Sequence, residues 1–249
     1  MIHVITGTDT EVGKTVSTAV LAARVLQLGQ SVAIYKPAQT GVRGQEPGDA
    51  QDVARWLGHP EKLTVSEGVR LAEPMAPADA ARCAGLDPVL ALPSLEGHVQ
   101  RIRELADRHD VVLVEGAGGL LVELTAQGQN IADLAVALGA ELVVVARPDL
   151  GTLNHSMLTL EACLARGFDR GTLLLGSYPA QPSVLHARNL ENLRQLAASH
   201  GWHFAGALPA NLVADPAGSR SALQQAARTL AWQPAATVLQ VRPTGRWAG

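Results

Sequence analysis

Residues 7–15 have the sequence GTDTEVGKT and join two apolar runs. The run before this stretch, Ile2–Thr6, has the composition of a buried strand, and the run after it, Lys14–Leu28, is rich in alanine, leucine and valine, as helices are. A loop between a strand and a helix binds phosphate when its backbone N–H groups and the helix N-terminus point at the anion. Lys14 adds a positive charge for the β- and γ-phosphate oxygens, and the Thr15 hydroxyl is a ligand for Mg²⁺. The stretch therefore predicts a phosphate-binding loop.

One position of this loop departs from the common pattern G-x-x-x-x-G-K-[ST]. Thr8 occupies the first glycine position, and Gly7 stands one residue earlier. The strand and the helix on either side still favour a phosphate-binding loop over a chance Gly-Lys-Thr at a helix start. Nucleotide binding is therefore predicted for Gly7, Thr8, Asp9, Thr10, Glu11, Val12, Gly13, Lys14 and Thr15.

Short apolar strands alternate with helical patterns along the rest of the chain. Strands are expected at Ser31–Lys36, Val111–Glu115, Glu141–Ala146, Thr172–Gly176 and His203–Leu208, and helices at Leu95–Arg108, Leu153–Arg166, Val184–His200 and Gly218–Trp232. Strands that are apolar on both faces and separated by helices predict an α/β fold. Its single, doubly wound and mostly parallel sheet carries helices on both faces, and its ligands bind at the carboxyl ends of the strands.

A single domain is expected over residues 1–232. Residues 58–94 contain many prolines and glycines, and we expect an irregular excursion with short helices there rather than a second domain. Residues 233–249 again contain prolines and glycines and are expected to be a loosely attached tail.

The composition favours a cytoplasmic protein without nucleic-acid or membrane partners. Of the 249 residues, 47% are hydrophobic, which is ample for a core, and the net charge of −3 gives no basic footprint for nucleic acid. The two cysteines, Cys83 and Cys163, are far apart and show no metal-ligand spacing, so a reducing compartment is expected. The apolar runs are too short to cross a bilayer.

Two charged residues stand at the ends of predicted strands. Lys36 precedes Pro37 and Gly41, which are expected to force the chain out of the sheet and leave Lys36 beside the phosphate-binding loop. This position favours anion binding over an ordinary surface lysine. Glu115 ends a buried strand and is followed by GAGG at 116–119. A buried acid needs a partner or a metal, and in phosphate-transfer enzymes an acid at this place serves Mg²⁺; the alternative is a tight turn with an incidental acid.

Asp49 is a weaker candidate. It lies in the sequence PGDAQD at 47–52. Because aspartate is a preferred N-cap, the residue taken alone is better explained as the cap of a helix.

These segments together resemble the dethiobiotin synthetase family of P-loop enzymes. The resemblance is carried by GTDTEVGKT at 7–15, with its missing first glycine, by YKPAQTG at 35–41, the pair Asp49-Ala50, EGAGG at 115–119 and GTLNH at 151–155. The five segments follow the family's order and spacing. The similarity spans most of residues 1–215.

The resemblance implies an ATP-dependent ligase of biotin synthesis that forms C–N bonds. Its members convert 7,8-diaminononanoate, CO₂ and ATP to dethiobiotin, ADP and phosphate with Mg²⁺. One amine is carbamated, the carbamate is phosphorylated, and the second amine closes the ring. The family forms homodimers with the substrate at the interface. Phosphoryl transfer of this kind needs positioning and positive charge rather than a nucleophilic side chain, and the sequence has no evident Ser-His-Asp or Cys-His set.

The resemblance also assigns roles by position. The metal ligands for Mg²⁺ are Thr15, Asp49 and Glu115. Lys14 and Lys36 balance charge on the transferred group, and Thr10 and Glu11 lie beside the reacting centre. The substrate-binding residues are Thr40, Gly118, Gly119, Thr152, Leu153 and Asn154, of which the last three start a helix whose free N–H groups can bind the substrate carboxylate.

The chain departs from the family where adenine is recognised. The family often has Asn after the strand that corresponds to Thr172–Gly176, and this chain has Ser177. A serine hydroxyl cannot span two atoms of a base edge. We therefore expect Ser177 at the base site and other nucleoside triphosphates besides ATP as substrates. The alternative is that backbone groups of residues 178–181 recognise adenine unaided.

Two other functions of P-loop proteins remain as alternatives. Amide-forming synthetases of the cobyrinate type carry a glutaminase domain with a cysteine nucleophile, for which this chain is too short. Partitioning-type ATPase switches have an additional lysine near the start of the loop and often a basic terminal helix. Residues 7–11 contain no lysine, and the predicted helix Gly218–Trp232 is not strongly basic.

Overall fold

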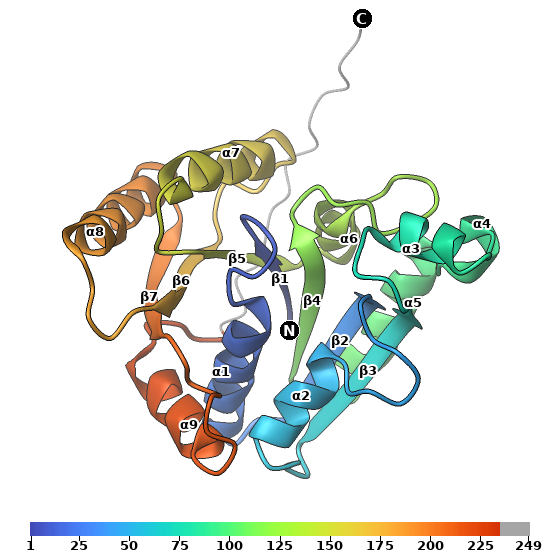
Figure 1. Cartoon of the computed structure of the whole chain (residues 1–249), viewed down its shortest axis with the longest axis horizontal. Helices are drawn as coiled ribbons and strands as arrows, with labels where there is room; N and C mark the ends of the chain where they lie inside the picture. Colours follow the sequence, from blue (N-terminus) through green and yellow to red (C-terminus); the bar gives the residue numbers. More distant parts are fainter. Residues whose placement is uncertain (235–249) are drawn as a thin grey trace, which may run out of the picture.

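A seven-stranded parallel sheet forms the centre of residues 1–234, the part of the chain that this computed structural model describes (Figure 1). The strand order is β3-β2-β4-β1-β5-β6-β7, so the strand that leads into the phosphate-binding loop lies in the middle. The strands are β1 (Ile2–Gly7), β2 (Val32–Gln39), β3 (Leu63–Arg70), β4 (Val111–Gly119), β5 (Glu141–Ala146), β6 (Thr172–Tyr178) and β7 (His203–Pro209). Every pair of neighbouring strands is parallel, which confirms the predicted α/β fold.

Helices cover both faces of the sheet. One face is covered by α1 (Lys14–Gln27), α2 (Asp49–Trp56) and α9 (Ser219–Thr229). The other face is covered by α5 (Leu95–Ala106), α6 (Ile131–Leu138), α7 (Thr152–Ala165) and α8 (Val184–Ser199). Two short helices, α3 (Pro77–Cys83) and α4 (Pro88–Ala91), form a small cluster of their own. In Figure 1, α1, α2 and α9 are grouped below and α7 and α8 lie above.

The sheet separates two apolar cores. Successive residues of β1 alternate between them: Val4 packs with the α5–α8 side and Ile5 with the α1, α2 and α9 side. Because side chains on a strand alternate between faces, a strand buried on both faces must be apolar at nearly every position. This explains the continuous apolar runs in the sequence. None of the helices in residues 1–234 combines the length and the apolar character that a membrane span needs.

Strand β2 continues beyond the residues predicted for it. Its pairing with β4 ends at Tyr35, but its pairing with β3 continues to Gln39. We expected Pro37 and Gly41 to force the chain out of the sheet directly after Lys36. This expectation was wrong, because β2 stays paired with β3 up to Gln39. Pro37 and Gly41 part β2 from β4 only, because β3 supplies hydrogen-bond partners on the other side. The separation of β2 from β4 opens the carboxyl edge of the sheet next to Lys36.

The interpretation of residues 58–94 was partly wrong. The segment contains the short helices that were expected, but it also contains β3, an edge strand paired with β2. The strand was missed because it is only half buried and includes Ser66, Glu67 and Gly68. The apolar residues Leu63, Val65 and Val69 do alternate with more polar ones, which is the signal of a strand with one buried face.

Asp49 is not the cap of its helix, as the residue alone suggested. Gly48 is the N-cap, and Asp49 is the first helical residue of α2. Its side chain is therefore free to point into the site described below. A loosely attached tail was expected at residues 233–249. All of this segment except residues 233 and 234 lies outside the described residues.

Candidate active site

The loop between β1 and α1 turns tightly around the space where a phosphate can bind. Gly13, the N-cap of α1, has φ 95°, a left-handed conformation that favours glycine, and no side chain caps the helix. The first N–H groups of α1 therefore keep their capacity to bind an anion. A Cβ on Gly7 would lie 2.7 Å from Val12 Cγ2 and 2.8 Å from the Asp9 carbonyl oxygen. The close packing explains a glycine at position 7, one residue before its usual place.

Lys14 projects from this loop into the cavity. Its ammonium donates a hydrogen bond of 2.9 Å to the carbonyl oxygen of Asp9. Burial, together with the positive charge of Lys36, lowers the pKa of Lys14 to about 8, although nearby carboxylates oppose the shift. A lysine with so few charged contacts is available to a phosphate.

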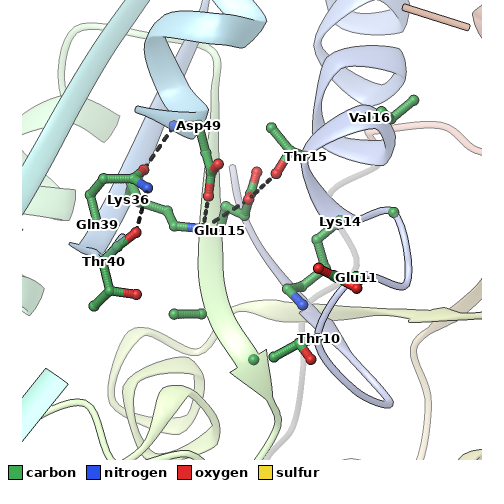
Figure 2. Close-up of a pocket in the computed structure, with 13 residues that line it drawn as sticks. Thr10, Glu11, Lys14, Thr15, Val16, Lys36, Gln39, Thr40, Asp49 and Glu115 are labelled. Atoms are coloured by element: carbon green, nitrogen blue, oxygen red, sulfur yellow. Dashed lines mark hydrogen bonds and ion pairs between the residues drawn. The ribbon is translucent and has the colours of Figure 1, made fainter. Parts of the chain in front are cut away.

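Four residues from four elements meet at the carboxyl edge of the sheet (Figure 2). The Lys36 ammonium lies 2.9 Å from Glu115 Oε1 and 2.5 Å from Asp49 Oδ2. The Thr15 hydroxyl donates to the same Glu115 oxygen over 2.8 Å. The arrangement follows from the topology, since Lys36 and Glu115 directly follow the last paired residues of β2 and β4. The structure thus brings the three predicted metal ligands together around Lys36.

Burial makes these contacts electrostatically strong. Only 3% of Lys36 and 1% of Glu115 is exposed. Burial works against the charge of Lys36, but the carboxylates of Glu115 and Asp49 outweigh it, so the pKa of Lys36 is raised above its usual value. The second Glu115 oxygen, Oε2, is buried without a hydrogen-bond partner among the described residues. A buried carboxylate oxygen without a donor is suited to a cation.

The donor set can hold a hard metal ion. Two carboxylates and one hydroxyl supply oxygen atoms only, which is the chemistry that Mg²⁺ prefers. No group of three or more His, Cys, Asp and Glu side chains suited to a metal occurs within residues 1–234. Three protein oxygens leave coordination positions that water or substrate phosphates would fill, as is usual for Mg²⁺.

Gln39 is a member of this site that the sequence did not single out. It is buried at the end of β2, and its Oε1 accepts a 2.7 Å hydrogen bond from the backbone N–H of Asp49. Its amide nitrogen donates to the carbonyl oxygen of Thr40 over 3.2 Å. A Cβ on Gly48 would come within 2.8 Å of Gln39 Oε1. Gln39 therefore fixes the start of α2, and with it Asp49, against the strand that carries Lys36.

These residues line one cavity of about 470 Å³. Its walls consist of Thr10, Glu11, Gly13, Lys14, Thr15, Val16, Lys36, Gln39, Thr40, Asp49, Glu115, Ala117 and Gly118 (Figure 2). Ten of the predicted site residues are among them. The other predicted residues of the loop, Gly7, Thr8, Asp9 and Val12, are not part of these walls.

The predicted carboxylate-binding residues Thr152, Leu153 and Asn154 do not line this cavity. They form the first turn of α7, which follows Gly151 at φ 93° and has no side-chain cap. The hydroxyl of Thr152 is buried without a hydrogen-bond partner among the described residues. Gly119 lies instead in a neighbouring cavity of about 390 Å³, together with Thr8, Asp9 and residues of α7.

Ser177 lies at the end of β6, against the phosphate-binding loop. A Cβ on Gly13 would be 3.2 Å from the Ser177 hydroxyl, and a Cβ on Gly176 would be 2.2 Å from the Val12 carbonyl oxygen. Ser177 is exposed and has φ 53°, an unusual conformation for a residue other than glycine, asparagine or aspartate. The end of β6 thus supports the loop from the side opposite to Lys36.

Known proteins resemble this chain closely in sequence. The family model described as an AAA domain matches residues 3–217. The ATP-dependent dethiobiotin synthetase BioD of Rhodococcus jostii is 48% identical over 84% of this chain and 86% of its own. The protein of the same name from Rhodococcus erythropolis is 45% identical over 93% of this chain and 95% of its own.

Similarity to solved structures concerns the fold alone. A ParA family ATPase from Chlorobium tepidum has a TM-score of 0.55, covers 92% of this chain and 93% of its own, and is 14% identical. The MinC:MinD cell division protein complex of Aquifex aeolicus gives a chain with a TM-score of 0.52, 91% and 94% coverage, and 13% identity. At such identity the partitioning-type alternative gains no support beyond the shared sheet.

Proposed function

The chain belongs to the ATP-dependent dethiobiotin synthetases, and from this we propose how its own residues close the ureido ring. The enzyme is a ligase that uses ATP to form a C–N bond. The proposed substrate is 7,8-diaminononanoate, of which one amine takes up CO₂ to form a carbamate. ATP phosphorylates the carbamate, and the second amine then attacks the carbonyl carbon and releases phosphate.

One observation carries this proposal: a single cavity brings two lysines, Lys14 and Lys36, together with the carboxylates of Asp49 and Glu115. The carbamate oxygen is itself the nucleophile, so the protein needs only to position the reactants and to neutralise charge. Lys14 lies on the loop side of the cavity, where the β- and γ-phosphates would bind. Lys36 and Thr40 lie on the opposite wall, beside the carbamate. Thr10 and Glu11 lie on the same side of the cavity as Lys14, in the phosphate-binding loop (Figure 2).

We further propose that Thr15, Asp49 and Glu115 hold Mg²⁺. The support is that their oxygens converge within one cluster and that Glu115 Oε2 is buried without a donor. When bound, the ion would neutralise charge on the phosphate oxygens during transfer. Gln39 contributes by fixing the backbone of Asp49.

The proposed homodimer would complete the substrate site. Thr152–Asn154 do not line the cavity that holds Lys36. The outer surface of α7 and its flanks exposes Leu121, Leu150, Leu153, Met157 and Leu158. An apolar surface of this kind next to a free helix N-terminus favours contact with a second copy, whose α7 would bind the substrate carboxylate.

The decisive test is ATP turnover that depends on both diaminononanoate and bicarbonate, with dethiobiotin identified by mass spectrometry. ADP and dethiobiotin should form in equal amounts. Phosphate release that does not respond to the diamine would instead indicate an ATPase switch.

A further inference from the structure

The ammonium group of Lys36 bonds to the same carboxylates that we propose as metal ligands. It contacts Asp49 Oδ2 at 2.5 Å and Glu115 Oε1 at 2.9 Å, and it also donates to the carbonyl oxygen of Gly116 at 3.1 Å. A lysine ammonium has three N–H donors. All three are therefore engaged within the protein, on groups at the base of the cavity.

This arrangement limits what Lys36 can do for the reaction. A donor that is already bonded to a carboxylate is not available to an oxygen of the transferred phosphoryl group. Lys14 differs, because within residues 1–234 its ammonium bonds only to a backbone carbonyl, that of Asp9. Lys36 must give up at least one of its three partners before it can bind substrate.

A divalent cation on the same carboxylates provides the reason for Lys36 to leave. Two positive charges that share two carboxylates in a buried site repel each other strongly, because little water screens them. The metal also takes the negative charge that holds the lysine. Lys36 is only 3% exposed and lines the cavity, so a lysine that left the carboxylates would turn into the cavity.

We propose that Mg²⁺ and the Lys36 ammonium exchange places on Asp49 and Glu115, so that metal binding releases Lys36 to bind the phosphoryl group or the carbamate. The inference rests on the proposed function, of which it adds the order of events. The lysine balances the two buried carboxylates until the metal arrives, and only then turns toward the substrate. Metal binding and the availability of the lysine are in this way one event.

The exchange predicts that Lys36 and the metal weaken each other's binding, because such coupling is reciprocal. Mn²⁺ without nucleotide is the probe, and its dissociation constant is measured by electron paramagnetic resonance. In Lys36→Met the competitor is gone, and Mn²⁺ should bind at least about tenfold more tightly. Lys14→Met is the matched control, since it removes a positive charge from the same cavity without a bond to either carboxylate; it should change the constant less than about threefold. Equal effects of the two substitutions would overturn the proposal.

A second measurement uses the unmodified chain and does not depend on how Lys36→Met folds. The sequence contains only three lysines, Lys14, Lys36 and Lys62, so ¹⁵Nζ-labelled lysine gives three signals that Lys→Arg variants can assign. Saturating Mg²⁺ should shift the Lys36 signal and speed its proton exchange with water, while the Lys62 signal stays unchanged. A Lys36 signal that is insensitive to Mg²⁺ would refute the exchange.

The two proposals fail separately. An enzyme that makes dethiobiotin while its Lys36 signal ignores Mg²⁺ retains the proposed function and loses the exchange. A chain whose Lys36 responds to Mg²⁺ but which makes no dethiobiotin loses the proposed function, while the exchange stands.

Discussion

Ser177 leads to a prediction about the choice of nucleotide. The residue lies at the end of β6, with its hydroxyl beside the last turn of the phosphate-binding loop. An amide side chain there could pair with two atoms of the adenine edge, whereas a hydroxyl offers one contact. Bidentate pairing discriminates between bases by about 1–3 kcal/mol. Without it, GTP and CTP should support turnover within roughly tenfold of ATP, or about 1.4 kcal/mol.

The substitution Ser177→Asn should restore discrimination at little cost to the fold. The backbone at this position has φ 53°, and asparagine adopts this conformation more readily than serine does. A gain of about 1–3 kcal/mol corresponds to an increase of roughly 5- to 150-fold in the preference for ATP. Ser177→Gly is the matched control, because it suits the same φ, lacks the hydroxyl and should leave the preference as it is.

The assay compares kcat/KM for ATP, GTP, CTP and UTP in the three proteins. The triphosphate contacts of Lys14 and the loop are common to all four nucleotides, so differences report on the base. A wild-type preference for ATP above roughly a hundredfold, about 2.8 kcal/mol, would refute the reasoning. It would favour the alternative in which the backbone of residues 178–181 recognises adenine, a segment that Ala210 holds through a 2.8 Å hydrogen bond to the Tyr178 carbonyl oxygen.

Four further outcomes are expected. Lys14→Ala should lower kcat by roughly 10²- to 10³-fold with an unchanged circular dichroism spectrum; near-normal turnover would exclude a phosphate role. Because the pKa of Lys14 is lowered to about 8, its ammonium is charged below that pH and neutral above it, so kcat/KM for ATP should fall above pH 8 and stay level in Lys14→Arg. EDTA should abolish activity and Mg²⁺ restore it, and Glu115→Gln should need more Mg²⁺; an unaltered Mg²⁺ requirement would contradict its role as ligand. Leu158→Glu should convert a dimer to a weakly active monomer in sedimentation experiments, whereas a fully active monomer of the original chain would contradict the shared site.

The sequence predicted those strands and helices whose position follows from the pattern of apolar residues in the segment itself. The central strands are buried on both faces, and their apolar runs identified them. The edge strand β3 was not predicted from the sequence, because it is buried on one face only and contains Glu67 and Gly68. For helix α2 the sequence suggested only a capped start at Asp49 and not its extent, since DAQDVARW offers few apolar residues; the packing of Ala50 and Val53 on α1 holds the helix instead.

The same distinction applies to the site. The loop at 7–15 follows from a motif, because the atoms that bind phosphate are contiguous in sequence. Gln39 could not be found in this way, since its significance depends on where α2 begins, ten residues later. The three contacts of the Lys36 ammonium could not be predicted from the sequence either, because they depend on the point at which β2 separates from β4. Contacts between distant segments require the strand order, which no local pattern contains.

The central position of β1 has a consequence for protein engineering. Every residue of the lysine and carboxylate cluster other than those of the loop comes from β2, α2 or β4, whereas β5, β6 and β7 lie on the far side of β1. The two halves of the sheet edge can therefore be diversified separately, provided that Gly176, which packs against Val12 of the loop, is kept. Libraries confined to the remaining positions at the ends of β6 and β7 should yield enzymes with new nucleotide preferences and intact chemistry. Randomising the ends of β2 and β4 should seldom leave active clones, because every substitution there must satisfy several partners at once.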